Sequence, residues 1–452
     1  MAKTAISDAP DQSTLRRNMR VFHHLLGNTL LASVINFTMW FAITFFVYLE
    51  TRSVAATGII AGIYAVLTAF SGIWFGSLVD HHKKKHVMLA SSLASLAFYV
   101  IAFVLYQVAA PGAFKDATGI TLWTFIVTVM LGVIVGNIRT IALMTAVTML
   151  VPEDRRDKAN GLVGTVSGVS FLVTSVISGL LVGLSGMFHA LLLAIVLTVG
   201  ILVHLYWLHI PERGVAHVAE GAEPQPHTVD LKGTLKVVLA IPGLLALILF
   251  TTFNNFLGGV FMALMDAFGL SLVSVETWGL LWGVLSLGFI VGGAIVAKKG
   301  LGKNPLRTLF LANVVAWAIC SVFTLRSSIV LLGIGMFIWL CLSPAMEAAE
   351  QTILQKVVPA ERQGRVFGFA QSIEQAASPV TAFLIGPLTQ FIFIPFMTTG
   401  AGADHIGSWF GTGADRGMAL VFTITGLIGL LITLLAMGSK YYRMLSARYA
   451  EA

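Results

Sequence analysis

The sequence predicts an all-α membrane protein whose twelve transmembrane helices form two pseudo-symmetric six-helix bundles. Three observations predict this fold class. The composition is too apolar for a water-soluble protein, apolar runs of membrane-spanning length recur along the chain, and one loop motif occurs at the same point of each half. Together they indicate a duplicated six-helix unit embedded in a bilayer.

The composition excludes a water-soluble enzyme of one or two domains. The chain has 452 residues, of which 57% are hydrophobic and only 11% are charged, and its mean hydropathy is +0.88. A soluble protein of this length has about a quarter of its residues charged. The two cysteines, Cys320 and Cys341, lie in apolar stretches. We therefore expect no disulfide framework, no metal site and no cofactor.

Twelve apolar stretches are long enough for spanning helices, which need about 20 apolar residues each. The stretch 120–150 exceeds one untilted span, but Arg139 within it and the loop signal at Pro152 favour one long helix. The first half contains predicted spans at 24–48, 57–79, 87–109, 120–150, 161–184 and 187–208. The second half contains them at 242–265, 277–297, 308–325, 328–355, 366–394 and 418–438.

These spans divide the chain into five parts. Arg16, Arg17 and Arg20 resemble the basic start of a signal peptide. The apolar run that follows is too long for one and has no small-residue cleavage site, so we expect the first span to be retained. The parts are an N-terminal segment 1–23, a first bundle 24–208, a linker 209–241, a second bundle 242–438 and a tail 439–452.

The basic residues predict the orientation. Most of the 28 lysines and arginines fall in the N-terminal segment, the even-numbered loops and the tail, which share one side of the membrane. The other side holds only Arg52, Lys115, Arg326 and Arg416. Cytoplasmic loops are enriched in Lys and Arg, so we expect a plasma-membrane protein with both termini in the cytoplasm. The net charge of +7 then reflects topology, and a nucleic-acid partner loses its support.

One loop motif is repeated in the two halves. Val151–Arg155 reads V-P-E-D-R after the fourth span, and Val358–Arg362 reads V-P-A-E-R after the tenth. The match continues without a gap through Lys158 and Arg365 to a glycine. A six-plus-six repeat implies two bundles with a path at their interface, an arrangement suited to alternating access.

The loop after the second span carries a resemblance to a known family. Gly76–Lys85 reads G-S-L-V-D-H-H-K-K-K and is similar to the G-x-L-x-D-R-x-G-R-[R/K] loop of the major facilitator superfamily. It departs from that loop at His81, where arginine is usual, and at Lys83, where glycine is usual. The twelve spans and the two repeated loops fit the same family, so the resemblance covers the whole chain and implies the major facilitator fold.

The resemblance also implies a conformational latch. In the family, the aspartate at the position of Asp80 pairs with charges and helix ends of the partner bundle. For the lysines of this loop, the alternative is a solvated segment that only determines topology. The implied latch residues are Gly76, Asp80, Lys84, Lys85, Arg155 and Arg362.

Within the family, the short layout and the Met- and Phe-rich helices are most similar to drug and macrolide exporters, which implies a drug:proton antiporter. The fifth span, however, lacks the G-x-x-x-G-P motif of many such antiporters. It offers Gly161, Gly164, Ser167 and Gly168 instead, which permit close helix packing. Proton antiport therefore has no support from this motif.

Four ionisable residues fall inside the predicted spans, namely Arg139, Glu347, Glu350 and Glu374. Each costs about 2.5–3.5 kcal/mol at the bilayer centre unless it faces protein or water, so each is a functional candidate. Glu347 and Glu350 share one helix face, and Glu347 lies about 15 Å inside the membrane. We expect one of the carboxylates to carry a coupling proton and Arg139 to tune it. The alternative is a fixed Arg–Glu network that holds helices together.

The family layout places the first, fourth, seventh and tenth spans around a central cavity. Aromatic and methionine side chains there offer deformable apolar contact, and amides orient a ligand without requiring a charge. Such a lining favours a bulky lipophilic or weakly basic molecule, although any one aromatic can equally face lipid. The predicted substrate-binding residues are Asn36, Phe37, Trp40, Asn137, Met144, Asn254, Asn255, Phe256, Met336 and Trp339.

The leading hypothesis is a monomeric secondary transporter that exports such molecules by alternating access, driven by protons. Two alternatives stay open: a transporter of a narrower metabolite, such as a siderophore or a peptide-like compound, and a non-transporting receptor on a transporter fold. We expect no enzyme, because the spans contain no clustered metal ligands or Ser/Lys nucleophile. We expect no ATP-driven pump, because no ATP-binding P-loop occurs. The glycine-rich outer loop 395–417 is expected to be a flap or a loose connection.

Overall fold

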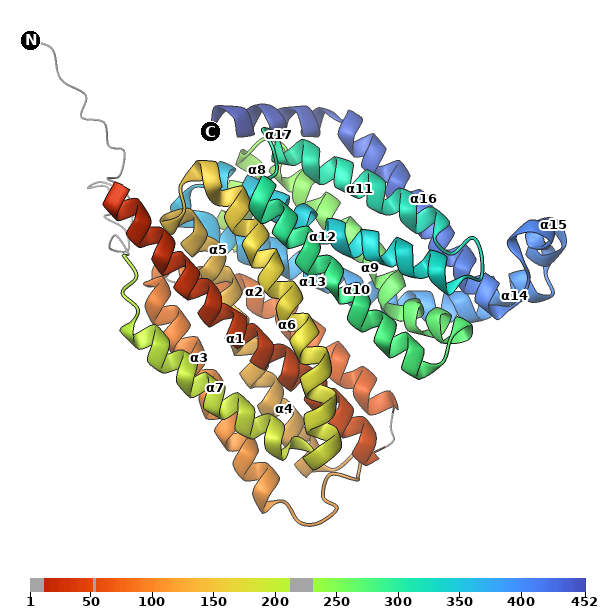
Figure 1. Cartoon of the computed structure of the whole chain (residues 1–452), viewed down its shortest axis with the longest axis horizontal. Coiled ribbons are helices and arrows are strands. Elements are labelled where there is room, and N and C mark those ends of the chain that lie inside the picture. The colour runs from red at the N-terminus through yellow and green to blue at the C-terminus, as the bar shows by residue number, and fades with distance from the viewer. Residues whose placement is uncertain (1–11, 52–53, 212–230) are drawn as a thin grey trace, which may run out of the picture.

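The computed structural model describes residues 12–51, 54–211 and 231–452. These residues are helical almost throughout, and they contain no β-strand. Figure 1 shows two helix bundles beside each other, one containing α1–α7 and the other α9–α16, with the start of α1 and the end of α17 toward the same end of the molecule. The predicted fold class is confirmed.

The first bundle contains the first six predicted spans. Its fourth span is interrupted at Asn137, whose φ of −66° and ψ of −20° remain helical, so that the axis continues from one helix into the next. The helices of this bundle are α1 (Gln12–Thr51), α2 (Val54–His81), α3 (Lys84–Val108), α4 (Ile120–Gly136), α5 (Ile138–Leu150), α6 (Arg156–Ser185) and α7 (Met187–Trp207).

The second bundle contains the other six spans. Three of its helices, α10, α11 and α12, begin at side-chain caps. The Ser328 hydroxyl accepts the Leu331 N–H, and the Asn304 side chain accepts the Arg307 N–H. Its long helices are α9 (Leu244–Leu272), α10 (Val275–Lys299), α11 (Pro305–Val322), α12 (Ile329–Val357), α13 (Gln363–Leu388) and α16 (Ala414–Gly438).

Most of the shorter helices occupy the loops, the linker and the tail, and the one at Thr389–Phe393 lies within the predicted eleventh span. With 3 to 12 residues, each is too short to span a membrane by itself. Short turns η1 (Glu153–Arg155) and η2 (Ala360–Arg362) follow the two repeated Val-Pro pairs, and η3 (Thr389–Phe393) continues α13. The others are α8 (Leu231–Ala240) in the linker, α14 (Ile394–Thr398) and α15 (Ala401–Phe410) in the outer loop, and α17 (Lys440–Glu451) in the tail.

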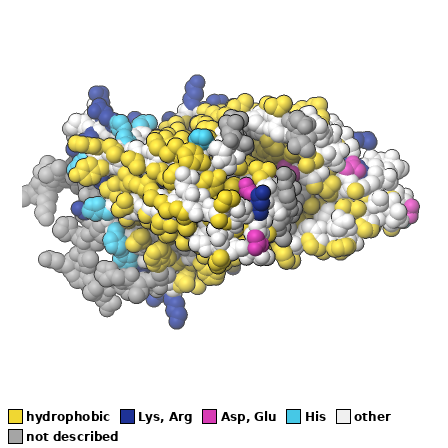
Figure 2. All heavy atoms as spheres, turned by 90° about the horizontal axis from the view of Figure 1, so that it is seen from below, with side chains coloured by type: hydrophobic (Ala, Val, Ile, Leu, Met, Phe, Trp, Pro, Cys, Tyr) yellow, Lys and Arg dark blue, Asp and Glu magenta, His cyan; other side chains and the backbone are white. Residues whose placement is uncertain are grey.

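The surface of the described residues matches a bilayer environment. Ten helical stretches are long and apolar enough to cross a membrane. Phe70 and Phe383, on two of the long helices, are 78% and 81% exposed, an arrangement suited to lipid rather than water. Figure 2 shows hydrophobic side chains over most of the visible flank and most of the visible histidines toward the left.

The two helix pairs that pack most extensively between the bundles are α2 with α13 and α6 with α10. In the first pair, Gly76 lies so close to Gly364 that a Cβ on Gly76 would overlap the Gly364 carbonyl oxygen. In the second pair, Gly161 lies against the backbone of Ala297 in the same way. Glycine permits this approach because its backbone can come into direct contact with a neighbouring helix.

Candidate functional site

A cavity of about 500 Å³ lies within the second bundle, lined by residues of α9, α11, α12 and α13. Three carboxylate side chains face it, those of Glu347, Glu350 and Glu374. Among the described residues that line it there is no lysine, arginine or histidine, and Met144 on α5 is the contribution of the first bundle. The cavity is therefore acidic and belongs almost wholly to one half of the chain.

Two of the carboxylates form a pair. The Glu350 and Glu374 carboxyl groups lie within hydrogen-bonding reach of each other. The Thr251 hydroxyl donates to Glu374 Oε1 at 2.8 Å, whereas Glu350 Oε1 is buried without a hydrogen-bond partner. Two ionised carboxylates in contact repel each other, so this pair is suited to hold one proton or to face a cation.

Amide and indole groups form the wall beside the carboxylates. Trp317 Nε1 donates to Asn254 Oδ1 at 2.6 Å, and the Asn254 amide nitrogen donates to the Phe250 carbonyl at 2.7 Å. The Ser378 hydroxyl donates to the Asn255 carbonyl at 2.7 Å. Because both ends of the Asn254 amide are engaged, the Trp317 ring is held in one orientation at the cavity.

The structure brings part of the predicted substrate-binding set to this cavity. Met144, Asn254, Asn255 and Trp339 line it together with the three carboxylates. Sequence reasoning missed Trp317 and Asn313, which lie on α11, the ninth span, outside the four helices that the family layout implies. Their spacing of four residues places both on one face of that helix, which is the available signal.

Other members of that set form a separate cluster in the first bundle. The Tyr99 hydroxyl donates to Asn36 Oδ1 at 3.3 Å, and the Asn137 amide donates to the Tyr64 hydroxyl at 3.4 Å. The Trp40 and Tyr64 ring centroids are 4.3 Å apart. These polar groups are satisfied by one another, so they pack helices together.

The remaining three predicted residues lie elsewhere. Met336 is buried in the core of the second bundle, and Phe256 packs against that core. Phe37, on α1, is 39% exposed. None of the three lines the cavity described above.

The structure does not bring Arg139 to the carboxylates. Arg139 is buried in the first bundle, where its guanidinium donates to Ser92 Oγ at 2.6 Å and to Asn28 Oδ1. The Asn28 amide in turn donates to the Ile201 carbonyl at 3.1 Å and contacts His204 Nδ1 at 2.9 Å. Arg139 thus ties α1, α3 and α5 together and connects through Asn28 to α7.

A second functional candidate lies where the bundles meet, at the end that carries both termini. Asp80, just beyond the predicted second span, accepts the backbone N–H groups of Gly364 at 2.7 Å and Arg365 at 2.8 Å. These N–H groups belong to the first turn of α13, where backbone donors have no partner in the helix. Burial raises the pKa of Asp80 to about 6, although the hydrogen bonds from Arg365 and Gly364 act in the opposite direction.

Arg365 is the residue at this junction that sequence reasoning did not assign to the site. Its Nε lies 3.7 Å from Asp80 Oδ2, and its terminal nitrogen donates to His81 Nε2 at 2.8 Å. His81 Nδ1 meanwhile donates to the Ser77 carbonyl at 2.8 Å. The signal that could have found Arg365 is its basic position in the repeated loop motif.

Gly76, another implied latch residue, packs against α13, whereas Lys84, Lys85 and Arg155 make local contacts. Lys84 Nζ donates to the Val79 carbonyl at 2.7 Å, and Lys85 Nζ donates to the Tyr206 carbonyl at 2.8 Å, all within the first bundle. Arg155 pairs with the neighbouring Asp154 at 3.8 Å, where both side chains are more than half exposed. Arg362 is half-buried at the end of η2.

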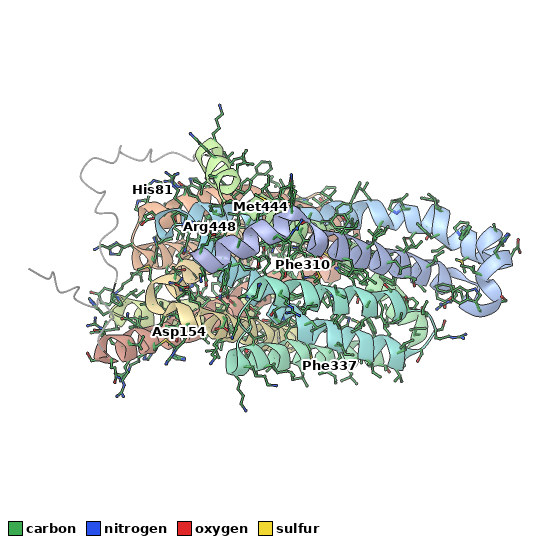
Figure 3. The ribbon with its side chains drawn as sticks, turned by 90° about the horizontal axis from the view of Figure 1, so that it is seen from above. His81, Asp154, Phe310, Phe337, Met444 and Arg448 are labelled. Carbon is green, nitrogen blue, oxygen red and sulfur yellow. The ribbon has the colours of Figure 1, made fainter. Side chains whose placement is uncertain are left out.

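Further contacts between the bundles gather at the same end. The Asn160 amide donates to the Thr352 hydroxyl and to Gln355 Oε1, both at 2.9 Å. Lys356 Nζ lies 2.9 Å from Glu153 Oε1. Figure 3 shows His81, Asp154 and Arg448, from three separate segments, toward this end of the molecule. The bundles are therefore closed against each other beside the termini.

A sequence model described as Major Facilitator Superfamily matches residues 28–382. The chain belongs to the major facilitator superfamily. Members of this family are membrane transporters rather than enzymes, so the protein is a multi-pass transporter of small molecules.

Characterised relatives are distant. Macrolide efflux protein A of Enterococcus faecalis is 22% identical over 329 residues, which cover 69% of this chain and 94% of that protein. The protein of the same name from Streptococcus pyogenes is 22% identical over 380 residues, which cover 80% of this chain and 88% of that protein. At this identity, the two relatives indicate common ancestry with this chain but do not establish its substrate.

Solved structures of the family have the same fold. The human organic anion transporter MFSD10 (TETRAN) superposes with a TM-score of 0.67 at 11% identity, covering 92% of this chain and 99% of that one. A bacterial homologue of the iron transporter ferroportin, in an outward-facing state, gives 0.66 at 13% identity, covering 93% and 100%. The proton:xylose symporter XylE gives 0.65 at 11% identity, covering 92% and 96%.

Proposed function

We propose that this transporter is a proton-coupled exporter of lipophilic or weakly basic small molecules. The observation that carries the proposal is the acidic cavity, in which Glu347, Glu350 and Glu374 stand beside two tryptophans and several amides. An organic cation is attracted both to carboxylates and to the faces of aromatic rings. A phosphate would find none of the basic residues that it requires among the described residues that line the cavity.

The paired carboxylates support proton coupling. One proton between Glu350 and Glu374 relieves the repulsion of the two negative charges, and a bound cation can relieve it equally well. Proton and cation then compete for the same two oxygen-bearing side chains. In a transport cycle, this competition would exchange the proton for the cation across the membrane. Arg139 has no part in this exchange.

The contacts beside the termini support alternating access. Hydrogen bonds and an ion pair connect the bundles at the end that carries both termini, through Asp80, Arg365 and Asn160. Release of these contacts, with closure at the opposite end, would expose the cavity to the other side. The basic residues of that end agree with a cytoplasmic location for both termini, and the two macrolide efflux relatives support export from the cell.

The proposal is tested in inside-out membrane vesicles with an acidic interior. The wild-type protein should accumulate a fluorescent lipophilic cation, and an uncoupler should abolish the accumulation. Glu374→Gln should reduce it at least tenfold, because the substitution removes the negative charge and alters the contact with Thr251. Glu50→Gln, which neutralises a carboxylate outside the cavity, should leave it unchanged.

Other outcomes separate the alternatives. Binding of the cation without gradient-dependent uptake by the wild type indicates a receptor. Neither binding nor uptake excludes this substrate class and favours a narrower metabolite. Full uptake by Glu374→Gln and by Glu350→Gln contradicts a coupling role for the pair.

A further inference from the structure

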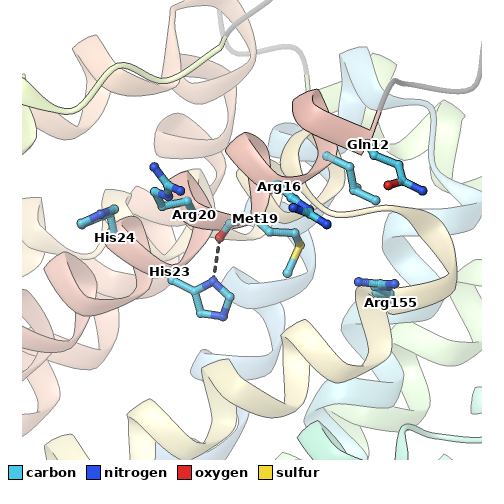
Figure 4. A pocket seen from close by; sticks show the side chains of 8 residues that line it. Gln12, Arg16, Met19, Arg20, His23, His24 and Arg155 are labelled. Atoms are coloured by element: carbon cyan, nitrogen blue, oxygen red, sulfur yellow. Dashed lines mark hydrogen bonds between the residues drawn. The ribbon is translucent and has the colours of Figure 1, made fainter.

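A groove of about 930 Å³ lies outside the cavity, at the end of the molecule that carries the termini. Figure 4 shows that the first turns of α1 form one side of it and that Arg155, after α5, lies on the other. Five side chains that are cationic or can become so line it: Arg16, Arg20, His23, His24 and Arg155. Neither the transport cavity nor the contacts between the bundles use this groove.

The positive charge of the groove is not neutralised within the described part of the chain. No aspartate or glutamate lines it there. Arg16 and Arg20 take part in no ion pair among the described residues. Arg155 lies 3.8 Å from Asp154, but the two side chains are 55% and 77% exposed, and an exposed pair of this kind contributes little. The described residues that line the groove thus present positive charge, which suits an anion.

The basic side chains share one face of α1. Arg16 and Arg20 are one turn apart, and His23 and His24 continue the same row on the next turn. His23 Nδ1 hydrogen-bonds the Met19 carbonyl at 2.7 Å, so its other ring nitrogen, Nε2, is the one left for a ligand. Membrane topology depends only on how many positive charges a segment carries. Here the positive charges are in addition arranged in a row along one groove.

The length of α1 places the groove at the membrane surface. Its 40 residues extend about 60 Å, about twice the thickness of the hydrocarbon core. The end with the arginines must therefore lie at or beyond the level of the lipid headgroups. Leu15 and Met19, which also line the groove, offer apolar contact beside the charged groups. A lipid has both components, a charged headgroup and apolar chains.

We propose that this groove binds the headgroup of an anionic phospholipid. Guanidinium groups bind phosphate oxygens with paired hydrogen bonds, and two arginines one turn apart can hold the same phosphate. The apolar side chains and the position at the end of a spanning helix favour a lipid over free phosphate. The lipid would connect α1 to the loop that begins α6, so it stabilises this end of the first bundle.

The proposal is tested by titrating the purified full-length protein, in dodecyl maltoside, with phosphatidylglycerol or phosphatidylcholine and counting bound lipids by native mass spectrometry. The wild type should prefer phosphatidylglycerol. The double variant R16Q/R20Q should weaken its binding about 25-fold, at about fivefold for each arginine. The control K298Q/K299Q removes two exposed charges at the end of α10, outside the groove, and should retain the preference.

Three results would overturn the proposal. Equal weakening by both double variants indicates attraction to general surface charge. Displacement of the lipid by inorganic phosphate at comparable concentration indicates a site for a soluble anion. Equal binding of the two lipids by the wild type shows no anionic selectivity. If R16Q/R20Q unfolds at a lower temperature than the wild type, R16K/R20K decides: it keeps the charge, loses the paired hydrogen bonds and should bind with intermediate affinity.

Discussion

The carboxylate of Asp80, on α2, accepts the backbone N–H of Gly364, on α13, across the junction between the two bundles. An acidic side chain of one bundle thereby caps a helix of the other, where the helix dipole favours negative charge. The contact exists only while the bundles are close at this end. Its presence therefore distinguishes the closed junction from an open one.

Acidification should favour the closed junction through Asp80. The pKa of Asp80 is about 6 when it is buried at the junction, against an ordinary value of 3.8 when it is exposed. The closed state therefore binds the proton more tightly, gains population as pH falls through 6 toward 4, and loses it as pH rises. Pulsed electron paramagnetic resonance between labels at Lys83 and Glu361 measures the two populations.

The comparison with Asp80→Asn isolates this effect. The substitution removes the buried carboxylate and keeps a side chain of the same size at the junction. In Asp80→Asn the gain of the closed state on acidification should therefore disappear. The same pH response in wild type and variant would show that Asp80 is not the titrating group.

A methyl group at Gly76 should prevent closure. Gly76→Ala places a Cβ against the Gly364 carbonyl oxygen, where only backbone can yield. The matched substitution Gly200→Ala adds the same methyl group on α7, where nothing lies within 4 Å of it. We expect the label distance to lengthen, and transport to fall at least tenfold, in Gly76→Ala alone. Equal transport by both variants would mean that the close approach is dispensable.

The paired carboxylates should act as one unit. If Glu350 and Glu374 share a single proton, Glu350→Gln and Glu374→Gln should each abolish proton release on cation binding, and the double variant should be no worse than either. Proton release is measured with a pH dye in weakly buffered detergent solution. Two independent sites would instead give losses that multiply.

Arg139 should contribute to stability and not to ligand binding. Arg139→Gln leaves Asn28 and Ser92 without their buried partner, which costs about 1–3 kcal/mol and lowers the thermal unfolding midpoint. Cation affinity at the cavity should stay within about twofold of the wild type, because Arg139 lies in the other bundle. Arg448→Gln, on the exposed face of α17, is the control. A large loss of affinity in Arg139→Gln with an unchanged midpoint would restore a coupling role.

The spans could be predicted because a membrane helix satisfies its own backbone and must carry its own apolar surface. The residues of each span are therefore sufficient to predict it. The sequence predicts one helix over residues 120–150, and the structure interrupts this helix at Asn137. The short helices α8, α15 and α17 could not be predicted in this way. Their sequences are brief and amphipathic, and packing against neighbours stabilises them, as where Leu445 of α17 lies against Gly243.

The acidic residues of the site could be predicted because placing a carboxylate at membrane depth costs free energy. Such residues are therefore rare in spans unless they have a function. The cavity wall could not be predicted, since hydropathy does not show which face of a helix meets which neighbour. Asn36 and Asn254 occupy similar positions in the two halves. One bonds to Tyr99 inside its own bundle, and the other holds Trp317 at the cavity. The difference depends on Tyr99 and Trp317, which lie on other helices, so the two asparagines alone do not predict it.

The cavity belongs to the second bundle, although the two halves share one architecture. In the alternating-access cycle proposed above, a rotation of one bundle against the other would carry Thr251, Glu350 and Glu374 together and keep their mutual distances. We therefore propose that the second bundle, residues 242–438, determines the chemical preference and that the first bundle moves against it. A chimaera that exchanges the second bundle alone should inherit the cargo of its donor.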